Sequence, residues 1–278
     1  MGLTLTQRHR WVSAATAAGF GVARDLGPDD GSRVAVDVNA RGDIAVAWNT
    51  TGPDPTRRAL SVARGSVAGF AATTTINAGR AGGAYNESDV AVAPDGRVVV
   101  AFQWYRDTLV LPNTQGVVLA MTAARGRPFP QPTAISALTG GSSAFSIEVE
   151  AVGTRVVIAW EQALQTDGTP QDVWSTTIDP AKSPSSWPRA TRLTGQAHIM
   201  SLTSDGRRAE LLSWSPDGAG GTVLFSSLTS TAGNLQTAAR TSSPTFTYPY
   251  FAAAGGGTFA TARNLSPSGD TVLIAVAG

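Results

Sequence analysis

The feature that most constrains this chain of 278 residues is an internal repeat with a period of about 50 to 58 residues. In each copy a short alternating segment ends in a tight turn rich in Gly or Asp-Gly, which supplies the positive φ that hairpins need. A second strand follows, and its ending is a small residue, then a large one, then a polar one. The five endings are Ala47-Trp48-Asn49, Ala101-Phe102-Gln103, Ala159-Trp160-Glu161, Ser213-Trp214-Ser215 and Ala262-Arg263-Asn264.

Two more strands are predicted in each copy. A third strand follows the second, and a fourth is marked by an aromatic residue or Leu six positions before a final residue that is usually Ile or Leu. The marking pairs are Phe20/Leu26, Phe70/Ile76, Phe129/Ile135, Trp187/Leu193 and Leu235/Thr241. No long helical pattern interrupts them. The sequence therefore predicts an all-β chain built from repeated four-stranded antiparallel sheets.

Four short strands in each of five repeats is the layout of a five-bladed β-propeller, with six or more blades, or membership of a longer propeller, as the alternative. We expect one domain over 1–278, with blades at 33–83, 84–143, 144–196, 197–247, and 248–278 plus 1–31. The last blade lacks a fourth strand and a fourth-strand pair precedes the first blade, so we expect the N-terminal strands to close the last blade. Trp11–Thr16 and Thr271–Val276 both resemble third strands, which leaves one surplus strand for self-association.

In its repeat plan, essentially the whole chain resembles the β-propeller superfamily, but it matches no subfamily signature. No blade closes with a Trp-Asp pair, and the double glycines do not follow second strands as in kelch repeats. Ser204-Asp205-Gly206 and Pro94-Asp95-Gly96 depart from the sialidase Asp-box, so sialidase activity is not carried over.

Composition excludes several classes of function. With 21 basic and 20 acidic residues the net charge is +1, which argues against a nucleic-acid binder, and the absence of Cys excludes disulfides. No apolar run is long enough for a membrane span. Low charge suits a secreted or surface protein, and the lone lysine, Lys182, indicates a GC-rich, bacterial source. We expect an extracellular or cell-surface location without a signal peptide in this sequence, and the cytoplasm is the alternative.

Our main functional prediction is a non-catalytic, lectin-like binding module that recognises a glycan or a protein through the propeller face with the longer loops. The most distinctive segment of that face is Trp104-Tyr105-Arg106, because aromatic and Arg side chains dominate binding sites. A polar ring at the ends of the second strands joins it, together with two tyrosines that enter the last blade. These further candidates are Asn49, Gln103, Glu161, Ser215, Asn264, Tyr248 and Tyr250.

Two alternatives stay open. The first is a glycoside hydrolase that uses carboxylates of the inner strands as acid and as base or nucleophile, with Asp37, Asp89, Glu148 and Glu150 as candidates. The second is a structural assembly domain. We expect no metal and no cofactor, because His9 and His198 are the only histidines, and we interpret Pro28-Asp29-Asp30-Gly31 as a turn rather than a calcium loop.

Overall fold

The structure is a computed structural model. It describes residues 9–13, 15–16, 19–20, 22–28, 34–51, 58–66, 68–76, 83–106, 116–136, 143–163, 171–216, 221–229, 235–243, 247–253, 259–264 and 272–277. Within these residues the regular secondary structure consists of β-strands and one 3-10 turn, η1 (Pro184–Ser186).

Four consecutive antiparallel sheets, here called blades 1 to 4, form the body of the protein. Blade 1 contains β5 (Val34–Val38), β6 (Asp43–Thr51) and β7 (Arg58–Ser66), and both β8 (Gly69–Phe70) and β9 (Thr74–Ile76) pair with β7. Blade 2 contains β10 (Gly83–Val92), β11 (Val98–Arg106), β12 (Gly116–Ala123) and β13 (Thr133–Ala134). Blade 3 contains β14 (Ser143–Val152), β15 (Arg155–Ala163), β16 (Asp172–Ile178) and β17 (Thr191–Thr194). Blade 4 contains β18 (His198–Ser204), β19 (Arg208–Pro216), β20 (Gly221–Thr229) and β21 (Gln236–Ser243).

Three smaller sheets flank these blades. At the C-terminal end β22 (Thr247–Ala253), β23 (Phe259–Asn264) and β24 (Val272–Ala277) form a three-stranded sheet. At the N-terminal end β1 (His9–Val12) pairs with β4 (Arg24–Pro28), and β2 (Ala15–Thr16) pairs with β3 (Gly19–Phe20).

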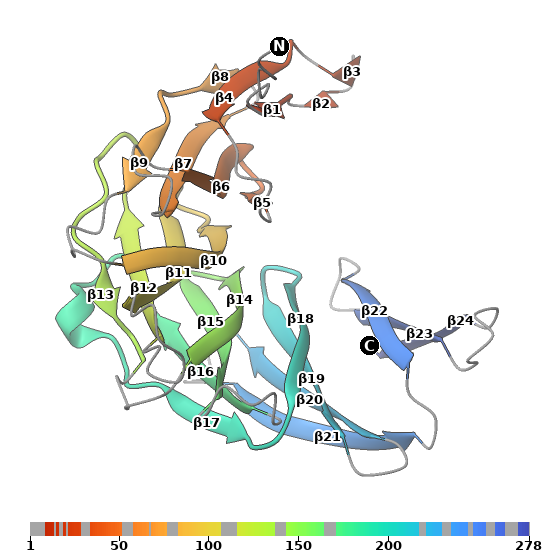
Figure 1. The fold of residues 1–278 in the computed structure, drawn as a ribbon. Helices are drawn as coiled ribbons and strands as arrows, with labels where there is room; N and C mark the ends of the chain where they lie inside the picture. Colours follow the sequence, from red (N-terminus) through yellow and green to blue (C-terminus); the bar gives the residue numbers. More distant parts are fainter. Residues whose placement is uncertain are drawn as a thin grey trace, which may run out of the picture.

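Blades 1 to 4 and the C-terminal three-stranded sheet follow one another along an arc. Their first strands lie on its inner side (Figure 1): β5, β10, β14, β18 and β22. This arrangement confirms the predicted all-β propeller fold with four-stranded antiparallel blades. The predicted total of five blades stays a prediction.

Tight turns set the direction of each first hairpin. Gly42, Gly96 and Gly206 lie in the turns after β5, β10 and β18 with φ of 75°, 82° and 82°, a region that side-chain-bearing residues rarely adopt. These are the Gly and Asp-Gly turns expected from the sequence. They keep one end of every blade short, so the carboxyl ends of the second strands all emerge at the other end.

The core lies between blades rather than inside any one of them. The second strands of blades 1, 2 and 3 turn small side chains towards the following blade and their aromatic side chain towards the preceding one. Ala47 thus packs in one cluster with Phe102, and Ala101 in the next cluster with Trp160. All four side chains are fully buried, as the alternation of small and large residues in the repeat predicted. Since an isolated blade would expose both faces, stacking is what stabilises the sheets.

Trp48 of blade 1 needs a preceding neighbour, and the N-terminal strands provide it. Leu26 of β4 and Val12 of β1 pack against Trp48, whose side chain is fully buried. The two-stranded sheet β1-β4 thus occupies the position of a preceding blade. The described strand pairs do not join it to β24, so the predicted sharing of one blade by the two termini is not seen in the pairing.

Among the described residues no helix is long and apolar enough to cross a membrane.

Candidate functional site

Four of the five acidic side chains on the inner strands of blades 1 to 3 are called here the carboxylate cluster: Asp37, Asp89, Glu148 and Glu150; the fifth is Glu87. Strand register places them on two levels. Asp89 and Glu148 lie opposite Ala101 and Ala159, the small residues that precede the aromatic of each second strand. Asp37 and Glu150 lie opposite Ala45 and Val157, one two-residue step or about 7 Å further along the sheet.

Backbone groups of the next blade hold two of these carboxylates in place. The Val92 N–H donates to Asp37 Oδ2 at 2.7 Å, and the Val149 N–H donates to Asp89 Oδ2 at 2.7 Å. A third N–H, that of Val38, donates to Asp37 Oδ1 at 2.7 Å. Inner strands are sheet edges, so half of their N–H groups have no strand partner, and a carboxylate is a strong acceptor for them.

Glu150 is the most perturbed acid of the cluster. Its half-buried position and the negative charges of Asp37, Asp89 and Glu148 raise the pKa of Glu150 from 4.5 to about 9. Burial also raises the pKa of Asp37, against the opposing effect of its two backbone hydrogen bonds. At neutral pH the cluster therefore combines a protonated carboxylic acid with neighbouring carboxylates, which is the pairing that acid–base chemistry requires.

Glu161 and His198 form a polar pair one two-residue step further along the sheet from Glu148. Glu161 comes two residues after Ala159 on β15, so its side chain shares that face. Its Oε1 accepts the Ile199 N–H at 2.7 Å, and its Oε2 lies 3.1 Å from His198 Nδ1. Glu161 is buried, whereas the His198 side chain is 35% exposed. No contact of His198 with Glu161 could be predicted from the sequence, because only the stacking of β15 against β18 brings the two side chains together.

Trp104, Tyr105 and Arg106 were predicted to lie in a loop of the binding face, and this is wrong for their backbone. All three belong to β11, where Tyr105 pairs with Ala84 and Gly116. The side chain of Trp104 is only 7% exposed and packs in the cluster between blades 1 and 2. A buried indole is not a platform for stacking a ligand, so the structure assigns Trp104 to the core. The side chains of Tyr105 and Arg106 lie outside the described part of the structure.

The three members of the predicted polar ring whose side chains are described are buried. Asn49, Gln103 and Glu161 are 1%, 1% and 4% exposed and lie between blades. Their position at the strand ends is as predicted, but contact with a ligand stays untested. Four other candidates lie on β19, β22 and β23 and their side chains are outside the described part: Ser215, Tyr248, Tyr250 and Asn264.

Metal sites were not expected from the sequence. Among the described residues no group of three or more His, Cys, Asp or Glu side chains is arranged to hold a metal ion. Asp29 and Asp30, weighed above as a calcium loop, lie outside the described residues.

Comparison with known proteins gives a likeness of fold. No family model matches the chain, and no curated protein matches it. An α-L-arabinanase of Penicillium chrysogenum superimposes with a TM-score of 0.53 at 11% identity, over 86% of this chain and 79% of that one. The polysaccharide lyase Uly1 gives 0.51 at 9% identity, over 87% and 56%. A sialidase of Trypanosoma rangeli gives 0.53 at 13% identity, over 95% of this chain and 48% of its own.

These solved structures are carbohydrate-active enzymes, and they contradict our main prediction of a non-catalytic binding module, which is wrong. At 9% to 13% identity the likeness establishes the fold. The activity has to be argued from the residues of this chain.

Proposed function

We propose that this protein is a glycoside hydrolase whose active site is the carboxylate cluster. The observation that carries the proposal is the pKa of Glu150, raised to about 9 among three further carboxyl groups of the inner strands. Glycoside hydrolysis needs a protonated acid beside an ionised carboxylate, and a site that pushes two pKa values apart assigns those roles.

Glu150 is the proton donor in this proposal. Protonated at neutral pH, it gives its proton to the glycosidic oxygen of the leaving group as the bond to the anomeric carbon breaks. A carboxylate of the cluster then acts as nucleophile or as base towards water. Asp89 suits that role best, because the Val149 N–H at 2.7 Å stabilises its negative charge and fixes its orientation. Asp37 is the second candidate for the same role.

The decisive experiment is product analysis. The purified chain is incubated with arabinan, other neutral polysaccharides, polyuronates and sialylated oligosaccharides, and products are identified by mass spectrometry. We expect hydrolysis of at least one glycan, and loss of about 10²-fold or more in kcat for Glu150→Gln. A dinitrophenyl glycoside, which needs no proton on its leaving group, should be cleaved nearly normally by that variant. Asp89→Asn should fail on both kinds of substrate.

The matched control is Asp95→Asn, because Asp95 lies on an exposed turn and pairs with Arg97. Unsaturated products would identify elimination and refute hydrolysis. Binding of a glycan with unchanged products would refute an enzyme of either kind. An extracellular location, which a polysaccharide substrate implies, is part of the same proposal.

A further inference from the structure

A cavity of about 270 Å³ opens between blades 1 and 2, at the end of the sheets that carries the tight turns. Its walls come from the start of β6, the end of β7, the turn before β11 and the turn after β12. Of the described residues, none of the carboxylate cluster lines it. The proposed hydrolase activity therefore leaves this cavity without a role.

Arg64 brings a half-buried positive charge to the wall of this cavity. Its Nη1 donates to the Ala124 carbonyl at 3.2 Å, and its Nη2 donates to the Arg127 carbonyl at 2.7 Å. The guanidinium also lies 4.7 Å from the ring centroid of Phe129. These contacts use two of its five N–H donors, and no described carboxylate forms an ion pair with it. A partly desolvated cation without a counter-ion is unfavourable, so an anion in the cavity would stabilise it.

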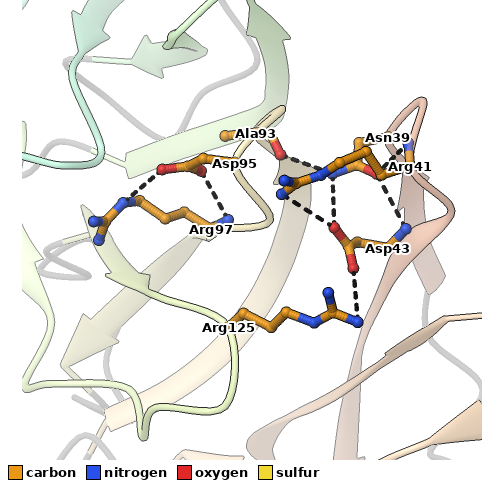
Figure 2. Close-up of polar contacts among 7 residues, drawn as sticks. All are labelled: Asn39, Arg41, Asp43, Ala93, Asp95, Arg97 and Arg125. Atoms are coloured by element: carbon orange, nitrogen blue, oxygen red, sulfur yellow. Dashed lines mark hydrogen bonds and ion pairs between the residues drawn. The ribbon is translucent and has the colours of Figure 1, made fainter.

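Arg125 adds a second guanidinium to the same wall. Its side chain is 72% exposed, and its nearest Nη lies 3.5 Å from Asp43 Oδ1. The other oxygen of Asp43 faces Arg41 Nη2 at 3.5 Å and accepts from Asn39 Nδ2 at 3.2 Å (Figure 2). Arg41 and Asn39 thus already compensate the negative charge of Asp43 without Arg125. The positive charges of Arg64 and Arg125 are therefore in excess at the wall of the cavity.

The turn between β10 and β11 does not change the net charge of the cavity wall. Asp95 and Arg97 pair with each other at 2.8 Å, so together they add no net charge (Figure 2). Gly96, between them in the sequence, faces the cavity without a side chain, and a Cβ there would lie 2.9 Å from Asp43 Oδ2. Gly65 and Gly69 contribute bare backbone to the part of the lining that belongs to blade 1. A ligand group can therefore approach closely between two cations.

We propose that this cavity binds a small oxyanion, held by the guanidinium groups of Arg64 and Arg125. A guanidinium group can bind two oxygen atoms of one anion at the same time. Phosphate and sulfate present such oxygens in a tetrahedral arrangement, and a carboxylate presents them in a plane. The volume of about 270 Å³ is slightly below that of pockets for drug-sized ligands, so the carrier is no larger than about a monosaccharide. This site is separate from the proposed hydrolase reaction and stands without it.

The test is a titration of the full, ¹⁵N-labelled chain at constant ionic strength with sodium phosphate, sodium sulfate and sodium glucuronate, each in turn. We expect saturable shifts of the Gly65, Gly69 and Gly96 amide signals with at least one anion. Arg125→Ala should weaken that binding about tenfold or more, since it removes a charge-assisted hydrogen bond. The double variant Asp95→Asn/Arg97→Ala removes the ion pair of the neighbouring turn without changing its net charge, and should leave the affinity unchanged.

Arg64→Lys keeps the positive charge but removes the planar guanidinium that can donate two parallel hydrogen bonds, and it should also weaken anion binding. If that variant does not fold, the exposed Arg125→Glu still decides, because it reverses a charge at the wall without disturbing the core. Shifts with glucuronate alone would indicate a carboxylate ligand, and shifts with phosphate or sulfate would indicate a tetrahedral one. Unsaturable shifts with all three anions, or equal affinity in Arg125→Glu and the unmodified chain, would overturn the proposal.

Discussion

Replacing Glu150 by Gln should make the protein more stable at neutral pH while removing the proposed activity. The folded state keeps Glu150 protonated up to about pH 9, whereas the unfolded chain ionises it near the ordinary value of 4.5. Between these values the folded state binds more protons than the unfolded state, so stability falls as pH rises through that window. Below about pH 4.5 both states are protonated and the contribution vanishes.

The size of the effect on the free energy of unfolding follows from the interval between the two pKa values of Glu150. Each pH unit above the unfolded pKa costs about 1.4 kcal/mol until the folded pKa is reached. At pH 7 the cost is therefore at most about 3.5 kcal/mol, and a neutral Gln of similar shape avoids it. The gain should be near zero at pH 4 and largest near pH 9.

The assay is urea unfolding of the unmodified chain, Glu150→Gln and the control Asp95→Asn at pH 4, 7 and 9. The control removes an exposed carboxylate and should change the free energy of unfolding by less than about 1 kcal/mol at each pH. If Glu150→Gln follows the pH dependence of the unmodified chain in parallel, Glu150 is ionised in the folded state. Its assignment as proton donor would then fail, whatever the activity of the variant.

Three further predictions concern stability and are checked by urea unfolding. Trp104→Ala should lose about 3–5 kcal/mol, because the indole is buried between blades 1 and 2; an unchanged midpoint would restore the prediction of a loop of the binding face. His198→Ala should lose about 1–3 kcal/mol, because buried Glu161 loses a partner at 3.1 Å, and Glu161→Gln in that background should recover part of it. Gly65→Ala should destabilise by about 1–3 kcal/mol, because the new Cβ would lie 2.5 Å from the Gly69 carbonyl oxygen, and full stability would show that β8 moves away freely.

The fold was predictable because its determinants are local. The alternating segment before the first Gly-containing turn predicted a strand, and β5 (Val34–Val38) occupies that position. The pair Phe70/Ile76 predicted a fourth strand, which the structure divides into β8 and β9 on the same partner. The small residue before each aromatic predicted how blades stack, since close approach of sheets needs Ala where the neighbour places Phe or Trp.

The site was predictable only in part. Alternation correctly put Asp37 and Glu150 on inner strands, but their mutual influence arises when separate blades stack around one axis. A single sequence contains no signal for that proximity, nor for the contact of His198 with Glu161. The error at Trp104 has a different origin. Aromatic and polar residues resembled a binding loop, yet pairing with the early residues of β10 extends β11 to Arg106.

Three acids of the first and second strands have a structural task that any mutational test must respect. At three successive interfaces a carboxylate accepts an N–H from the following blade: Asp37 from Val92, Asp89 from Val149, and Glu161 from Ile199. Alanine would leave those edge N–H groups unsatisfied and loosen the stacking, so a loss of activity would say little about chemistry. Asn and Gln retain an acceptor oxygen but cannot ionise. Asp89→Asn should therefore keep most of the stability that an alanine variant loses, and only then does its activity report on catalysis.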